Sequence, residues 1–197
     1  TERAVAAFSQ LVDNLPGSVY AADAHMQLGQ LYTSLGAADK AVAQYDLMSR
    51  SGEKRDRRES QLLMAQVHYN GKRFKKAIPL YWKFLEENPK DSRRTAVEDL
   101  LLTSYWLGDR GNPSLLEAVE RFWNHPIVAH IRWELGVQAY KAGDFAKAAE
   151  WLARYSAEHP KAAHAADSLF YLGEARFAQG DAKGAVTAYR ALFARFP

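Results

Sequence analysis

The residues of this sequence that could carry out acid–base or metal chemistry are its six histidines and its 23 aspartates and glutamates. A zinc site on one helix requires histidines at i and i+4, as in H-E-x-x-H, and no two histidines have that spacing. Carboxylates are frequent, but none forms a pair whose position suggests acid–base work. The sequence also lacks the G-x-S-x-G motif and a phosphate-cradling glycine loop. We therefore predict no catalytic residue, no metal site and no cofactor.

The basic residues are unevenly distributed. Residues 50–94 contain 13 of the 26 lysines and arginines but only 6 of the 23 carboxylates, a local charge of 13 − 6 = +7. This stretch could bind an acidic protein, an anionic lipid surface or nucleic acid, although a solvated helix surface is the interpretation we favour. Nucleic acid is not expected, because no nucleic-acid-binding module accompanies the charge. The candidate basic patch comprises Lys54, Arg55, Arg57, Arg58, Lys72, Arg73, Lys75, Lys76, Arg93 and Arg94.

The composition is that of an ordinary folded protein, with 48% hydrophobic residues and a net charge of +3 over 197 residues. Cysteine is absent, which excludes disulfides, thiolate metal ligands and a cysteine nucleophile. No apolar run approaches the ~18 residues that cross a bilayer, so no transmembrane segment is expected. Because the sequence begins with Thr1 inside a helical pattern, we expect it to be a segment of a longer protein.

The elements that position these residues are repeated. The stretch LGVQAYKAGDFAKAAEWLARYSAEHP, from Leu135 to Pro160, returns 37 residues later as LGEARFAQGDAKGAVTAYRALFARFP, from Leu172 to Pro197. Leu-Gly, Gly-Asp, a helical alanine and the final proline all recur. A fixed period of this size is typical of stacked repeats, in which one unit cannot bury its own apolar face.

The shared positions resemble the tetratricopeptide repeat, W-x2-L-G-x2-Y…A-x3-F…P, which pairs two antiparallel helices per unit. Small residues at Gly29, Gly136 and Gly173, and at Ala41, Ala77, Ala148 and Ala185, would let the helices approach closely. Large residues would fill the gap to the next unit, namely Tyr32, Tyr45, Tyr81, Tyr105 and Tyr189.

The residues between the helices of this pattern can be assigned to turn and cap positions. Gly36, Gly143 and Gly180 suit helix C-terminal positions that need a left-handed backbone, and Asp144 and Asp181 suit the N-caps that follow. Asn112 and Pro113 indicate a cap and a first helical turn, so the second helix there should begin about one turn late. The family tryptophan is missing from every unit, where its place holds His25, Gln61, Glu98, Arg132 and Leu169.

The resemblance implies an all-α fold, a right-handed superhelix of antiparallel helix pairs, with one lone helix followed by five helix-turn-helix units. A single repeat array is expected over 1–197, with a partial repeat at 1–16 and full repeats at 17–53, 54–89, 90–126, 127–160 and 161–197.

The segments between units have the form P-x-S/A-x-x-A, as in Pro16–Ala24 and Pro160–Ala166. This form resembles repeats of bacterial cell-envelope proteins, such as the lipoprotein of the outer-membrane β-barrel assembly machine and the Tol-Pal coordinator. The resemblance implies a periplasmic scaffold of the cell envelope, with peripheral proximity to a membrane. A cytoplasmic location stays open, because nothing in the sequence requires export.

In this family the first helix of each unit lines a concave groove, and helical spacing selects the residues on that surface. The surface becomes aromatic toward the C-terminal half, a composition suited to anchoring a partner peptide. The same spacing places Leu62 and Val137 on this face. The family's carboxylate clamp of Lys, Asn and Arg is not expected, because other residue types occupy its places. The predicted partner-binding groove comprises Gln30, Gln66, Tyr69, Asp99, Thr103, Trp106, Trp133, Tyr140, Phe170, Glu174 and Phe177.

These features predict a non-catalytic scaffold that binds other proteins through the concave groove. Two alternatives remain open: a structural segment that self-associates through its end repeats, and an accessory arm of a larger envelope enzyme or secretion machine. Residues such as Phe170 and Phe177 would then be covered by a neighbouring unit. The sequence does not identify the partner.

Overall fold

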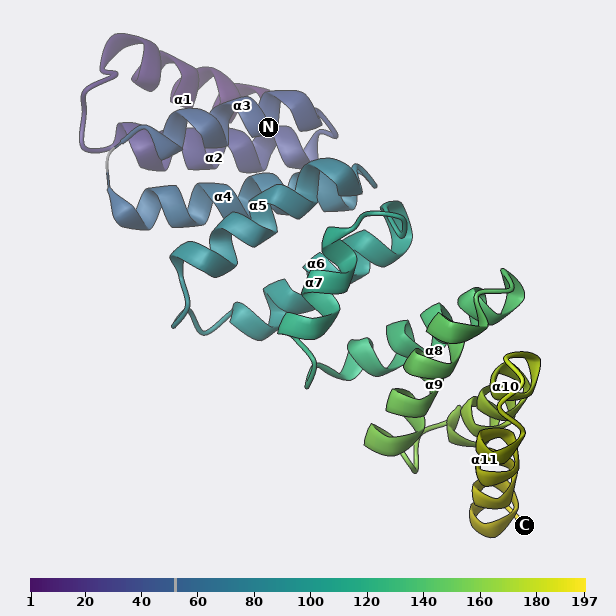
Figure 1. Ribbon diagram of the computed structural model, residues 1–197. Coiled ribbons are helices and arrows are strands. Elements are labelled where there is room, and N and C mark those ends of the chain that lie inside the picture. Colours follow the sequence, from purple (N-terminus) through teal and green to yellow (C-terminus); the bar gives the residue numbers. More distant parts are fainter. Residues whose placement is uncertain (52) are drawn as a thin grey trace. The chain divides into compact units, whose positions relative to one another are not determined.

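The computed structural model describes residues 1–51 and 53–197, and this part of the chain folds into eleven helices with no strand (Figure 1). This confirms the all-α tetratricopeptide-type fold that the repeat pattern predicts. The helices are α1 (Glu2–Asn14), α2 (Ala21–Ser34), α3 (Ala38–Ser49), α4 (Lys54–Asn70), α5 (Phe74–Glu87), α6 (Arg94–Gly108), α7 (Ser114–Arg121), α8 (Pro126–Lys141), α9 (Phe145–Glu158), α10 (Ala165–Ala178) and α11 (Ala182–Arg195).

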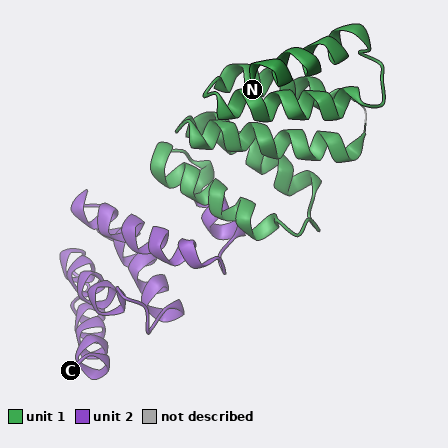
Figure 2. Ribbon diagram, turned by 180° about the vertical axis from the view of Figure 1, so that it is seen from behind, with its two compact units in different colours: residues 1–115 green, residues 116–197 purple. Residues whose placement is uncertain are grey.

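The chain divides into two compact units, residues 1–115 and 116–197, which are drawn in different colours in Figure 2. In the first unit each helix from α2 to α5 packs against the helix before it and the helix after it. In the second unit α8 packs against α9, α9 against α10, and α10 against α11. The first helices of neighbouring repeats also touch, α2 with α4 and α8 with α10. Successive hairpins therefore stack on one another within each unit, as repeat architectures require.

The turns inside the hairpins have the predicted geometry. Gly143 and Gly180 adopt φ of +79° and +80°, a left-handed conformation in which a side chain would be strained. Asp144 and Asp181 then cap the next helix, since their side chains accept hydrogen bonds from backbone N–H groups at 3.2 Å and 2.9 Å. Between α4 and α5 the left-handed position is held by Lys72, with φ of +55°.

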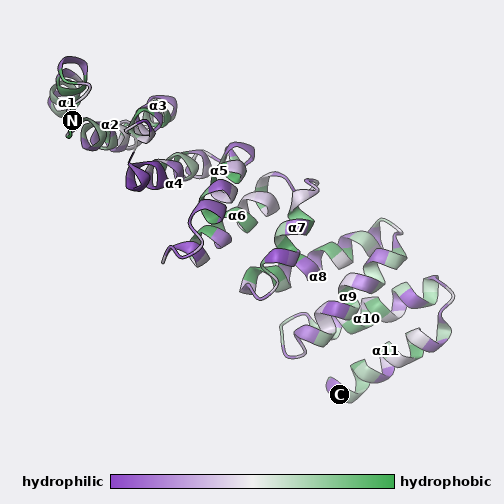
Figure 3. Ribbon diagram, turned by 60° about the vertical axis from the view of Figure 1, so that its left-hand side comes forward, coloured by the Kyte–Doolittle hydropathy of each residue, from purple (hydrophilic) through white to green (hydrophobic). Residues whose placement is uncertain are grey.

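Close approach of the helices depends on a small residue facing a large one. A Cβ atom on Gly173 would lie 2.5 Å from the ring of Tyr189, and one on Gly29 would lie 2.3 Å from the ring of Tyr45. Ala148 is fully buried in the second unit. Figure 3 shows hydrophobic and hydrophilic residues on every helix, as expected when one side of each helix is packed and the other is solvated. The close approach of helices predicted at Gly29 and Gly173 is thus confirmed, although Tyr45 and Tyr189 meet the glycine of their own hairpin, whereas the pattern assigned them to the gap before the next unit.

Helix α7 is the exception among the second helices, with only eight residues. Asn112 Oδ1 accepts a hydrogen bond from the N–H of Ser114 at 3.0 Å, and the helix begins at Ser114. The late start that Asn112 and Pro113 predict is therefore confirmed. Among the described residues, no helix is both long enough and apolar enough to cross a membrane.

Candidate functional site

The first-helix face of a compact unit is the surface formed by the first helices of its repeats, which are α2, α4 and α6 in unit 1 (residues 1–115) and α8 and α10 in unit 2 (residues 116–197). In unit 1 this face carries polar residues and shielded aromatic rings. Gln30, Gln66 and Asp99 are exposed, whereas Thr103 is half-buried. Leu62, which the helical spacing places on this face, is 5% exposed. That expectation was wrong, because Leu62 contributes to the core and not to the surface.

The two aromatic residues predicted on this face are partly covered. Tyr69 packs edge-on against Phe74 and Tyr81, with ring centroids 5.5 Å and 6.4 Å away. The guanidinium of Arg110 lies 4.0 Å from the ring centroid of Trp106 and donates a hydrogen bond from Nε to the Trp106 carbonyl at 2.6 Å. A ligand would have to displace Arg110 or stack outside it.

The first-helix face of unit 2 is aromatic and more open. Phe170 and Phe177 on α10 are 46% and 69% exposed. Tyr140 on α8 lies 5.2 Å from Tyr171, which in turn packs edge-on against Phe170. The structure therefore brings Tyr140 and Phe170 into one cluster. Val137 is 6% exposed, so its predicted position on the surface was wrong.

Trp133 is half-buried and its ring stacks on His164, with centroids 3.7 Å apart and planes 12° apart. His130 lies beside both rings, at 6.2 Å and 6.4 Å. The sequence reasoning missed His164 because this residue precedes α10 and so falls outside the first-helix spacing. Its signal was the repeated loop that begins at Pro160, which places one residue of the loop against the preceding first helix.

Glu174 on α10 is half-buried and accepts a short hydrogen bond from the hydroxyl of Tyr189 on α11. Burial of the phenol, together with this negatively charged acceptor, raises the pKa of Tyr189 to about 12. Glu174 is thus already engaged within its own hairpin, and its role on this face is to hold Tyr189 against Gly173.

Eight of the ten residues of the candidate basic patch lie at the two ends of the hairpin of α4 and α5, and Arg93 and Arg94 lie at the start of α6. Four of them, Lys72 to Lys76, surround the turn between α4 and α5, whereas the group from Lys54 to Arg58 begins α4. Helix α4 has 17 residues, so about 25 Å separates its two ends. Arg73, Lys75 and Arg94 are paired with carboxylates, respectively those of Asp39, Asp109 and Glu98.

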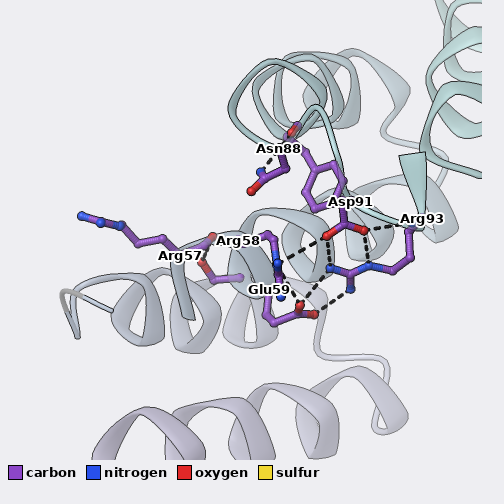
Figure 4. Close-up of polar contacts among 8 residues, drawn as sticks. Arg57, Arg58, Glu59, Asn88, Asp91 and Arg93 are labelled. Carbon is purple, nitrogen blue, oxygen red and sulfur yellow. Dashed lines mark hydrogen bonds and ion pairs between the residues drawn. The ribbon is translucent and has the colours of Figure 1, made fainter. Parts of the chain in front are cut away.

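Arg58 and Arg93 belong to a four-residue network with Glu59 and Asp91 (Figure 4). Arg93 donates to Glu59 at 2.8 Å and 2.9 Å and to Asp91 at 3.0 Å. The hydrogen bonds from Arg93 lower the pKa of Asp91 to about 2 and also lower the pKa of Glu59. This part of the patch is therefore neutralised within the protein.

A cleft of about 470 Å³ remains between the start of α4 and the end of α5. Its lining residues are Lys54, Arg57, Arg58, Gln61, Lys83, Glu87 and Asn88. A shallower hollow continues it along Pro89, Lys90 and Asp91. Lys83 on α5 and Lys90 in the loop after α5 are cations of this surface that the sequence analysis did not select, because the pattern in the sequence does not show which residues of this segment face α4.

Two of the residues that replace the family tryptophan form side-chain hydrogen bonds between the two helices of their hairpin. The sequence analysis did not predict these bonds. Gln61 Nε2 donates to Glu87 Oε2 at 2.7 Å, and Arg132 Nη1 donates to Glu158, each across 26 positions of the chain. Arg132 is fully buried, and burial lowers its pKa. The signal was present in the sequence as a carboxylate at the same offset in both repeats.

Among the described residues, no three His, Asp or Glu side chains are arranged to hold a metal ion.

The comparisons with known proteins agree with this architecture. One sequence profile described as tetratricopeptide repeat matches residues 1–54 and 109–163, and a second of the same description matches residues 167–197. No curated protein sequence matches significantly.

Among solved structures, the MamA protein aligns with 16% identity and a TM-score of 0.50, over 90% of this chain and 93% of that one. YrrB, described as a TPR protein with an unusual peptide-binding site, aligns with 16% identity and a TM-score of 0.48, over 97% and 93% of the two chains. BtubC from P. vanneervenii aligns with 21% identity and a TM-score of 0.42, over 96% and 86%. At such identities the similarity shows the fold alone. With more than half of its residues matched by one profile of the family, the chain belongs to the tetratricopeptide repeat family.

Proposed function

We propose that this chain is a non-catalytic scaffold that binds segments of partner proteins along the first-helix face of its repeats. The observation that carries the proposal is the open aromatic face of α8 and α10 in unit 2. Phe177 is 69% exposed and Phe170 is 46% exposed, in a family whose two-helix units serve as frames for protein interaction. Exposed aromatic clusters on a rigid frame are typical of partner-binding sites.

The energetics favour a flexible partner. The rings of Tyr140, Tyr171 and Phe170 already pack on one another, so their side chains lose little freedom when a ligand covers them. Full burial of an exposed phenylalanine contributes up to about 2 kcal/mol. An extended or helical segment that covers Phe170 and Phe177 would therefore carry most of the ordering cost itself.

The experiment begins with peptides selected on the wild-type chain from a phage-displayed random library, and measures their affinities by calorimetry. The double variant Phe170→Ser/Phe177→Ser should weaken them at least about tenfold. The matched control is Phe193→Ser, which removes a 73% exposed phenylalanine from the second helix α11. Equal affinities for the wild type and the double variant, or failure to select any peptide, would refute binding at this face. Trp133→Ala is a weaker test, because Trp133 also packs against His164.

We further propose that this scaffold works in the bacterial cell envelope, on the periplasmic side. The support is the P-x-S/A-x-x-A form of the segments between repeats, at Pro16–Ala24 and Pro160–Ala166. The full-length native protein should be released by osmotic shock or recovered with envelope membranes. Its recovery with cytoplasmic markers would overturn this location and leave the binding proposal intact.

Self-association is the second candidate, favoured by the outer face of α11. Val186 and Phe193 on this helix are 47% and 73% exposed. If this face pairs with another copy, sedimentation velocity should show mass increasing with concentration in the wild type and a monomer in Phe193→Ser. A monomer at all concentrations of the wild type would exclude this candidate.

A further inference from the structure

The cleft of unit 1 holds basic residues that the protein itself leaves unneutralised. It lies between the first two turns of α4 and the last two turns of α5, on a different unit from the aromatic face. Figure 4 shows Arg57 pointing away from the network of Arg58, Glu59, Asp91 and Arg93. Among the described residues, the side chains of Lys54, Arg57 and Lys83 have no ion-pair partner.

The balance of charge over the cleft and its continuation is positive. Their lining includes five basic side chains, Lys54, Arg57, Arg58, Lys83 and Lys90, and two carboxylates, Glu87 and Asp91. Arg58 and Asp91 lie 3.5 Å apart and offset each other. Four cations therefore face one carboxylate, a surplus of +3.

Gln61 determines how much of this charge stays available. It is 6% exposed, lies in the cleft lining, and donates from Nε2 to Glu87 Oε2 at 2.7 Å. Glu87 lines the same cleft yet forms no ion pair with any described residue. Gln61 thus positions the Glu87 carboxylate where it does not neutralise Lys54, Arg57 or Lys83.

We propose that this cleft is a second binding site, specific for an acidic peptide segment of a partner protein. Its aspartate or glutamate side chains would contact Lys54, Arg57 and Lys83, and Lys90 would attract the next carboxylate along the hollow. The backbone N–H groups of such a segment can also donate hydrogen bonds to the Glu87 carboxylate. A ligand that carries only anionic acceptor groups would be repelled by Glu87.

The lining argues against nucleic acid and lipid. Base stacking requires aromatic platforms, and no aromatic residue lines the cleft or its continuation. A phosphodiester group has only acceptor oxygens to place near the Glu87 carboxylate. A bilayer surface is flat on this scale, whereas these cations line a concavity of about 470 Å³. A narrow chain that carries both carboxylates and N–H donors fits the lining best.

The test measures fluorescence anisotropy of a labelled oligoglutamate peptide on the whole chain, with oligoglutamine as the neutral peptide control. The variant Arg57→Glu/Lys83→Glu should lower the affinity at least about tenfold, and Glu87→Gln should raise it, because it removes the one opposing charge. Gln61→Leu should weaken binding a few-fold without any change in net charge, since it frees Glu87 to approach the cations. Circular dichroism would verify folding, and these positions other than Gln61 are at the surface.

The control for general electrostatics is Lys76→Glu, on the same helix but near its opposite end. Lys76 is seven residues from Lys83, about 10 Å along α5 and beyond the ~8 Å screening length of physiological salt. Equal weakening by Lys76→Glu and Lys83→Glu would overturn the proposal, as would an unchanged affinity in Glu87→Gln. Phosphatidylserine vesicles and single-stranded RNA are the competing probes. Stronger cleft-dependent binding of either one would also overturn it, and none of these results depends on the aromatic face of unit 2.

Discussion

The buried ion pair of unit 2 should respond asymmetrically when one partner at a time is removed. Arg132 is fully buried, its Nε and Nη2 find no hydrogen-bond partner among the described residues, and its counter-charge is Glu158, whose side chain is 30% exposed. Glu158→Ala leaves a buried guanidinium without its partner, and the two charged neighbours that remain, Arg154 and Glu120, act on it in opposite directions. Breaking a buried pair in this way costs 3–5 kcal/mol, and the partial exposure of Glu158 selects the lower end, about 3 kcal/mol.

Removing the other partner should cost far less. Arg132→Met replaces the buried charge by an apolar side chain of similar length, and Glu158 can turn to solvent or to Arg154, 3.4 Å away. The next repeat supports this expectation, because Leu169 occupies the equivalent position and is 4% exposed. We expect a change within about 1 kcal/mol, of either sign.

Urea denaturation followed by circular dichroism separates the two cases. With a slope of roughly 2 kcal/mol per molar urea, Glu158→Ala lowers the midpoint by about 1.5 M and Arg132→Met by less than about 0.5 M. Arg154→Met is the matched control, because its pair with Glu120 is 37% and 48% exposed and contributes at most about 1 kcal/mol. Equal losses for Glu158→Ala and Arg132→Met would refute the reasoning, since they would mean that the pair itself stabilises the fold.

Three further outcomes are expected. Gly173→Ala places a Cβ 2.5 Å from the ring of Tyr189 and should cost about 1–3 kcal/mol in urea denaturation, less in a Tyr189→Leu background; additive losses would contradict the contact. Asp181→Ala removes the cap of α11 and should cost about 1 kcal/mol by the same assay, whereas an unchanged midpoint would argue against the cap. Arg93 holds the folded-state pKa of Asp91 at about 2, below the unfolded value of roughly 3.9, so the stabilising contribution of this carboxylate is complete above about pH 4 and declines toward pH 2. The stability difference between the wild type and Asp91→Asn should therefore shrink over that interval, and a constant difference would contradict the assignment.

The sequence was sufficient to predict the fold because the same kinds of small, large and turn residues recur at equivalent positions of successive repeats. The small residue at Gly173 and the cap at Asp181 after Gly180 could be identified from the pattern, since a close approach and a left-handed turn accept few residue types. Leu62 was misplaced because helical spacing gives an angle around the helix axis and not the depth of the neighbours.

The ion pairs could not be predicted in the same way. Arg93 reaches Glu59 across 34 positions, and a cluster of basic residues along the sequence carries no information about such partners. The basic patch selected from the sequence therefore included Arg93, whose charge is neutralised by its network. It left out Lys83, whose unpaired charge reaches the cleft beside α4 only in the folded hairpin. Nothing in the comparisons tests which residues of either face bind a partner, so those assignments stay predictions.

One register position explains why the two units differ at the open ends of their hairpins. Where the family has tryptophan, Arg132 reaches Glu158 and is itself fully buried. The shorter Gln61 makes the equivalent bond to Glu87 and borders a cleft of about 470 Å³. Because Gln61 is neutral, it supplies no negative charge to pair with the nearby Lys54, Arg57 and Lys83. Charged residues are kept most readily where they are solvated or where they meet an opposite charge. The residue at the tryptophan position thus forms a buried ion pair in the repeat of Arg132 and borders the proposed binding cleft in the repeat of Gln61. Both repeats keep the same helix pairing.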